Sequence, residues 1–219
     1  MNPSRSRNFE QILQEFERQG LLLLSDSKLP SVSSLVAGGP VHGSWWGHPM
    51  GHAMFRVASE LSDHADSVVT KLVSGKVTFV HRRLWPALFS VATSRQSWQL
   101  KNLSAEARAI LGLVRQQGSV RSDQFERPPT FNIRALGKSV TELEGRLLIH
   151  SDEIHTESGA HARLLETWQH WAGRTGFKPK SLTPRDAKAQ LMDSLVELNR
   201  QCGGNGLLPW QQECSRLPK

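Results

Sequence analysis

Tyrosine is absent from this sequence of 219 residues, and cysteine occurs only twice, as Cys202 and Cys214. Two thiols far from any cysteine or histidine cluster build neither a zinc ribbon nor a disulfide framework. Their eleven-residue gap would allow one small disulfide loop, but we expect both thiols to be reduced. The leucine run at 21–24 is too short to cross a membrane, and the N-terminus lacks the apolar stretch of a signal peptide. These absences favour a soluble, cytoplasmic protein, for which we expect no cofactor and no membrane partner.

Acidic residues are the minority charge. Lys and Arg number 27 against 20 Asp and Glu, which gives a net charge of +7 and an isoelectric point near 9.9. Such a balance favours polyanionic partners, although many basic proteins bind none. Residues 1–103 carry eleven basic against seven acidic side chains, residues 104–172 eight against nine, and residues 173–219 eight against four. The middle of the chain therefore does not supply the basic excess.

The first half of the chain shows three helical patterns followed by a hairpin. Apolar residues recur at helical spacing in 8–19, and start and stop signals delimit two further helices over 31–37 and 49–63. Pro49 suits the first turn of the third helix, where its missing N–H costs nothing. Two β-branched runs within 67–81, separated by Ser-Gly, predict a β-hairpin.

The second half repeats this order. Ser104 caps a helix over 105–117, which is followed by a one-bridge strand, a short helix from Ser122 and a third helix over 131–146. A strand then begins at 147–150, and the chain continues as a returning strand or, from about Arg163, as a helix. A last helix starts at Thr183-Pro184. Its apolar face comprises Ala187, Leu191, Leu195 and Leu198. This face predicts that the helix packs on the body of the protein or on another chain.

Three helices and a hairpin, repeated, are the element order of a winged helix. We therefore expect a mainly α fold with small β-hairpins, built as tandem winged helix-turn-helix units plus a C-terminal helix. The expected boundaries are 1–95 for the first unit with a trailing helix, 96–103 for a linker, 104–172 for the second unit and 173–219 for the C-terminal tail.

The stretch GSWWGHPMGHAMF, residues 43–55, concentrates unusual residues at the start of the predicted third helix. His48 and His52 are four residues apart, a spacing that suits two metal ligands on one helical face. However, His48 precedes the proline and need not share that face, so we expect no metal and interpret both histidines as a polar lining or as structural. Trp45 and Trp46 precede the helix, where they either stack on a base or anchor the core.

Basic residues border the predicted first hairpin, or wing. Lys71 and Lys76 lie on either side of its tip, and Arg82 and Arg83 follow its second strand. Cations at a hairpin tip can reach phosphates beside a groove, while lysine also protects ordinary sheet edges. The predicted nucleic-acid-binding residues are Lys71, Lys76, Arg82, Arg83, Trp45, Trp46, His48, His52 and Arg56.

The predicted second wing has the opposite character. It carries acidic side chains that would repel phosphate, interspersed with histidines, and this suits a protein contact better than DNA. The same mixture is chemically eligible for a divalent ion, which we do not expect here. The residues concerned are His150, Asp152, Glu153, His155, Glu157 and His161.

Two stretches of the sequence are similar to the AlkZ-like family of tandem winged-helix proteins. The first is GSWWGHPMGHAMF together with the hairpin and the exit helix that follow it, and the second is residues 135–171. The resemblance covers most of residues 40–172, and the chain looks like a shortened relative. The best-known members are bacterial DNA glycosylases that act on alkylated or crosslinked bases, which implies a repair-related role.

One departure from the family weakens the enzymatic interpretation. Active members carry a Gln-x-Gln or Gln-x-Asp motif that places a water against the sugar, whereas the nearest strings here are Gln11-x-x-Gln14, Gln96-x-x-Gln99 and Gln116-Gln117. No catalytic residue can be carried over. We expect a double-stranded DNA-binding protein; the alternatives are a glycosylase-type hydrolase with a non-standard site and a protein-interaction module that acts through the second unit.

Overall fold

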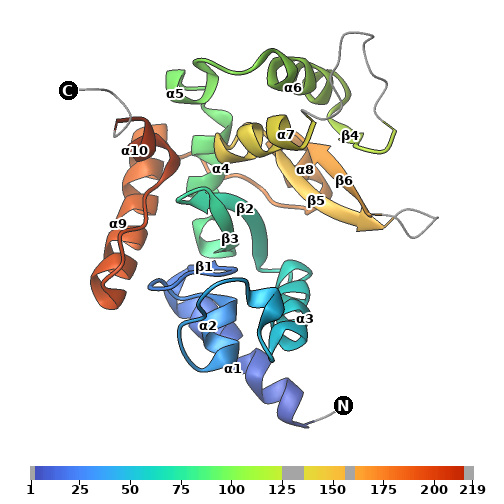
Figure 1. Ribbon diagram of the computed structural model, residues 1–219. Coiled ribbons are helices and arrows are strands. Elements are labelled where there is room, and N and C mark those ends of the chain that lie inside the picture. The colour runs from blue at the N-terminus through green and yellow to red at the C-terminus, as the bar shows by residue number, and fades with distance from the viewer. Residues whose placement is uncertain (1–2, 125–135, 156–160, 215–219) are drawn as a thin grey trace. The chain divides into compact units, whose positions relative to one another are not determined.

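The computed structural model describes residues 3–124, 136–155 and 161–214. The chain is mixed α/β, with many helices and two small antiparallel sheets of three strands each (Figure 1). It divides into two compact units: residues 1–87 with 185–219, hereafter unit 1, and residues 88–184, hereafter unit 2. None of the helices in the described ranges combines the length and apolarity that crossing a membrane requires.

Unit 1 begins with an amphipathic helix and a buried strand. Ile12 and Phe16 on one face of the first helix are buried, as the periodicity predicts, and the helix ends before Gly20. The second helix starts at a capping box, in which the Ser31 hydroxyl accepts from the backbone N–H of Ser34. The elements in order are α1 (Pro3–Gln19), β1 (Leu21–Leu23), α2 (Val32–Ala37), the 3-10 turn η1 (Trp45–Gly47) and α3 (Gly51–Ser62).

The predicted hairpin is confirmed as β2 (Ser67–Val73) and β3 (Lys76–His81). Ser74 and Gly75 both have positive φ, 53° and 70°, which is the backbone of the tight turn that suits twisted strands. The leucine run also joins this sheet, because β1 pairs with β3 and gives the order β1-β3-β2. This third strand was not predicted, since three consecutive buried leucines carry no alternation.

The C-terminal helices belong to unit 1. The predicted apolar face of α9 (Pro184–Cys202) is buried at all four positions, Ala187, Leu191, Leu195 and Leu198. Asn199 then holds the following loop, donating to the Gly206 carbonyl and accepting from its N–H, and α10 (Pro209–Cys214) follows. The loop reaches the first hairpin, where the Ser74 N–H donates to the Leu207 carbonyl at 2.7 Å. Packing on the body of the protein is thereby confirmed.

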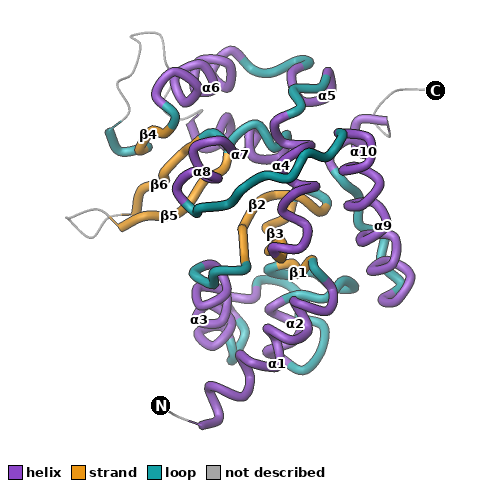
Figure 2. Tube along the Cα trace, turned by 180° about the vertical axis from the view of Figure 1, so that it is seen from behind, coloured by secondary structure: helices purple, strands orange, loops and turns teal. Residues whose placement is uncertain are grey.

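Unit 2 repeats the sheet of unit 1 with the order β4-β6-β5, and Figure 2 shows β6 between its two neighbours. Its core lies between helices and sheet and includes Ile110, Val114, Leu143 and Leu165. Residue 163 is still in a strand, so the chain returns as β6 and the helix begins only at Trp168. The elements are α5 (Ser97–Leu100), α6 (Ala105–Gln117), β4 (Ser119–Arg121), α7 (Leu136–Gly145), β5 (His150–His155), β6 (His161–Glu166) and α8 (Trp168–Arg174).

The connection from unit 1 to unit 2 runs through η2 (Arg82–Leu84) and α4 (Trp85–Thr93). Within the stretch predicted as a linker, 96–103, residues 97–100 form α5, and the buried Gln99 side chain bonds the Ala92 and Arg146 carbonyls. Most of the short helix predicted from Ser122 lies outside the described residues.

Candidate functional site

Aromatic side chains gather at the entry to α3. The rings of Trp45 and Trp46 are stacked, with centroids 4.3 Å apart and planes at 24°, and Phe55 lies 5.4 Å from Trp46. Trp46 is 58% exposed and Phe55 50%, and Met50 beside them is also exposed. We call Trp45, Trp46, Met50 and Phe55 the aromatic surface.

The backbone of this entry is held tightly. The His48 ring accepts from the Met50 N–H through Nδ1 at 3.1 Å, and the His48 carbonyl accepts from the Gly51 N–H at 2.8 Å. A Cβ on Gly51 would lie only 3.0 Å from the Trp46 carbonyl oxygen, so glycine lets the tryptophan turn approach the helix. The helix begins at Gly51, two residues later than predicted from Pro49, because the His48 turn occupies the residues between.

The segment of chain that carries the aromatic surface has no acidic side chain. No Asp or Glu occurs between Asp26 and Glu60, a segment that includes Lys28 and Arg56 and three histidines. On α3 itself, two basic side chains are exposed near Phe55: Arg56 follows it directly in the sequence, and His52 lies about one helical turn before it. An anion brought to this face meets no carboxylate from residues 27–59.

The structure places the predicted wing cations among partners of their own. Lys76 Nζ lies 2.6 Å from Asp26 Oδ2, and Arg82 Nη1 lies 3.0 Å from Asp66 Oδ1, while Arg83 donates to the Arg18 carbonyl at 3.0 Å. Lys71, on β2, is half-buried. Exposed ion pairs are worth only about 0–1 kcal/mol, so Arg82, which is 62% exposed, can exchange Asp66 for a phosphate. Lys76 is held by a carboxylate that is only 12% exposed.

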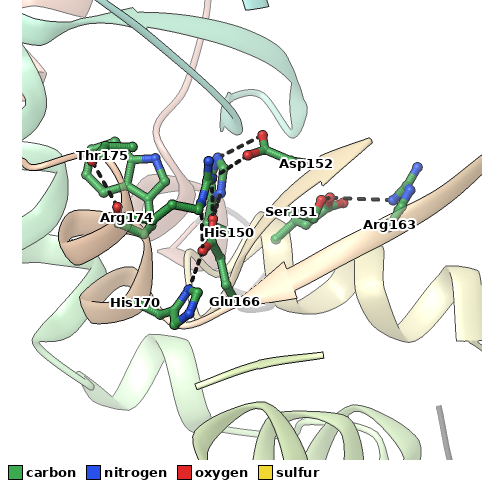
Figure 3. Close-up of polar contacts among 10 residues, drawn as sticks. His150, Ser151, Asp152, Arg163, Glu166, His170, Arg174 and Thr175 are labelled. Atoms are coloured by element: carbon green, nitrogen blue, oxygen red, sulfur yellow. Dashed lines mark hydrogen bonds and ion pairs between the residues drawn. The ribbon is translucent and has the colours of Figure 1, made fainter. Parts of the chain in front are cut away.

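A second polar cluster lies in unit 2, where β5, β6 and α8 meet (Figure 3). Glu166, at the end of β6, has a fully buried side chain. Its Oε1 accepts from His150 Nδ1 at 3.1 Å and from Arg174 Nη2 at 2.6 Å, and its Oε2 accepts from His170 Nδ1 at 2.7 Å. Burial raises the pKa of Glu166, but the hydrogen bonds from His150, Arg174 and His170 outweigh it and lower this pKa to about 2.

The same cluster has the composition of a metal site. His150, Asp152 and Glu166 each offer a ligand atom, and these atoms lie within 4.8 Å of one another. However, Arg174 Nη2 lies 2.5 Å from Asp152 Oδ2 and 2.6 Å from Glu166 Oε1, so a guanidinium already neutralises both carboxylates. A metal ion would have to displace it. The arrangement is suited to joining the hairpin to α8, and the buried Glu166 cannot touch a substrate.

This cluster was missed from the sequence, although a signal exists. Glu166, His170 and Arg174 recur at intervals of four, the spacing at which side chains meet along a helical turn. Of the predicted second-wing residues, His150 is buried beside Trp168, with ring centroids 5.3 Å apart, and Asp152 pairs with Arg174. Glu157 and the side chains of His155 and His161 lie outside the described residues.

One comparison with known proteins, the one with family models, found a relationship. No curated protein and no solved structure proved similar to the chain. The family described as AlkZ related matches residues 6–204, which include both sheets and the whole of α9. The chain therefore belongs to the AlkZ-related family.

Proposed function

We propose that the protein binds double-stranded DNA in a repair-related setting, with unit 1 as the reading unit. The order α1, β1, α2, α3, β2, β3 with the sheet order β1-β3-β2 is the topology expected of a winged helix. In that arrangement α3 is the helix that enters a groove, and its N-terminal residues face the bases. Membership of the AlkZ-related family supports the repair-related setting.

The observation that carries this proposal is the surface around the start of α3. It combines exposed aromatic rings with the exposed Arg56 and His52, in a segment of 33 residues, 27–59, that has no acidic side chain. On the hairpin β2–β3 and directly after it, Lys71, Lys76, Arg82 and Arg83 are offered as phosphate contacts, which position a protein without reading sequence. The second hairpin, with Asp152 and Glu153, suits a contact with protein better.

The proposal includes no hydrolytic step. Of the nearest glutamine strings, Gln96 and Gln99 bond each other's backbone and side-chain groups in a capping box, and Gln99 is fully buried. Gln11, Gln14, Gln116 and Gln117 are exposed on the helices α1 and α6. A glycosylase-type activity would be detected as release of a damaged base from alkylated duplex DNA.

A salt series tests the proposal. Each phosphate contact contributes about −0.9 to the slope of log affinity against log salt on duplex DNA. Arg56→Ala should therefore flatten the slope by about one unit, and Lys71→Ala with Lys76→Ala by roughly two, if each cation touches phosphate. The control is Lys138→Ala, which removes an exposed cation of α7 in unit 2.

Fluorescence anisotropy of a labelled duplex across the series provides the slopes. Unchanged slopes in the unit 1 variants, or a larger loss from Lys138→Ala, would move the contact surface to unit 2. Absence of salt-sensitive binding by the parent protein would reject DNA binding and favour the protein-interaction alternative.

A further inference from the structure

We infer that the aromatic surface binds an unstacked DNA base, so that the protein prefers a duplex containing an unpaired base over an intact one. This inference rests on the proposed DNA binding and adds the state of the DNA that is recognised. The ligand it assigns is the flat face of a nucleobase outside the base stack, with its flanking phosphate.

The first support is the contrast among the tryptophans. Trp85, Trp98, Trp168 and Trp171 are all buried and serve the cores of their units, whereas Trp46 is 58% exposed. Phe55 lies in the middle of α3 and is also turned outward, away from Met54 and Val57 in the core. Two large exposed rings in contact form an apolar patch of the kind that marks binding sites on soluble proteins.

The second support is that the rings are already arranged for stacking. Trp45 and Trp46 are nearly parallel at 4.3 Å, and the close approach at Gly51 holds their turn against α3. A ligand that stacks here orders little of the protein, which reduces the entropic cost of binding. Stacking on aromatic side chains tolerates any base, because every base has a π-face.

The third support concerns which DNA offers such a face. In an intact duplex each base is covered by its neighbours, and the grooves present only base edges and phosphates. An unpaired base can leave the stack at a small cost, since no pairing is lost. Arg56, next to Phe55 in the sequence, and His52, one turn earlier, are exposed and available to the phosphates that flank it.

The experiment compares three probes of the same sequence: an intact duplex, the duplex with one unpaired base, and the single strand. Affinities are measured by fluorescence anisotropy for the parent, Trp46→Ala, Phe55→Ala and Phe55→Leu. Val196→Ala is the control, because it removes a side chain of α9 that is 54% exposed, far from the aromatic surface in the sequence. Since Trp46 and Phe55 are both largely exposed, these changes should leave folding intact, which circular dichroism verifies.

The parent should bind the unpaired-base and single-stranded probes more tightly than the intact duplex. Trp46→Ala and Phe55→Ala should each lose roughly five- to hundredfold affinity for those two probes, the range for one stacked base, and much less for the intact duplex. Phe55→Leu should lose affinity like Phe55→Ala, since leucine keeps apolar area but has no ring face. Val196→Ala should match the parent.

Salt-sensitive duplex binding without any preference for the unpaired base would overturn the inference and leave the proposed function standing. A preference that survives both alanine substitutions, or full binding by Phe55→Leu, would also overturn it. If the parent binds none of the three probes, both the inference and the proposed function fail.

Discussion

Glu166 and Glu197 have similarly low pKa values for different reasons. In Glu197 hydrogen bonds from Arg200 and Gln201 lower the pKa to about 2 in an exposed position on α9. In Glu166 burial works in the opposite direction, and hydrogen bonds from His150, Arg174 and His170 must overcome it. Removing the Glu166 charge therefore leaves the buried His150 and the partly exposed Arg174 and His170 without a charged acceptor, whereas Arg200 is simply rehydrated.

Glu166→Gln should lower the free energy of unfolding at pH 7 by about 3 kcal/mol. This value is at the lower end of the range for breaking a buried ion pair, because Arg174 and His170 retain contact with water. The introduced amide also directs an N–H toward groups that are themselves donors. Glu197→Gln is the matched control and should change stability little. Urea unfolding of the three proteins measures the difference.

The difference in stability between the parent protein and Glu166→Gln should depend on pH. Because folding depresses the pKa of Glu166 from 4.5 to about 2, its stabilisation is complete above pH 4.5 and is lost as the pH falls toward 2. The stability gap between the parent and Glu166→Gln should narrow across that window. A gap that is constant from pH 7 to pH 2.5, or a larger effect from Glu197→Gln, would contradict the assigned role of the buried carboxylate.

At the scale of elements, the position of η1 on α3 depends on one close backbone approach. Gly51→Ala would place a Cβ 3.0 and 3.1 Å from the carbonyl oxygens of Trp46 and Trp45. We expect the tryptophan turn to shift and the coupled circular dichroism band of the stacked indoles to lose amplitude. Gly47→Ala, where a Cβ meets nothing within 4 Å, should leave this band unchanged.

The affinity for an unpaired base should follow the circular dichroism band, since both depend on the arrangement of Trp45 and Trp46. An unchanged band in Gly51→Ala would mean that the turn relaxes without moving the rings. A loss in Gly47→Ala as large as in Gly51→Ala would show that any added side chain in this stretch disturbs them.

At the scale of the whole molecule, the C-terminal helix contributes to the unit that contains the N-terminus. Leu195 on α9 is 1% exposed, and its neighbour Val196 is turned outward. Leu195→Ala should lower the free energy of unfolding by about 2–5 kcal/mol, the cost of a buried leucine cavity, whereas Val196→Ala should cost little.

Urea unfolding followed by tryptophan fluorescence, with circular dichroism as a second probe, tests this. Two probes are needed because a chain with two compact units need not unfold in one transition. Equal effects of Leu195→Ala and Val196→Ala would contradict the packing of α9 on unit 1.

Local chemistry was sufficient to predict several elements from the sequence. The first hairpin follows from β-branched runs around Ser74-Gly75, and α1 and α9 follow from apolar periodicity, because turn geometry and helical faces depend on neighbouring residues. The basic balance and the resemblance to the AlkZ-like family also come from the sequence. The predicted domain boundaries and nucleic-acid-binding residues stay predictions.

Only the tertiary structure decided which side chains are exposed and which distant groups meet. The pairing of β1 with β3, the Lys76–Asp26 pair and the approach of His150 to Glu166 join residues that are 16 to about 60 positions apart. Trp45 and Trp46 are adjacent, yet one is half-buried and the other exposed, because burial is determined by all the elements packed around a residue. The spacing of apolar residues depends only on the local helix or strand. It therefore predicts neither which distant residues meet nor which of two adjacent tryptophans is exposed.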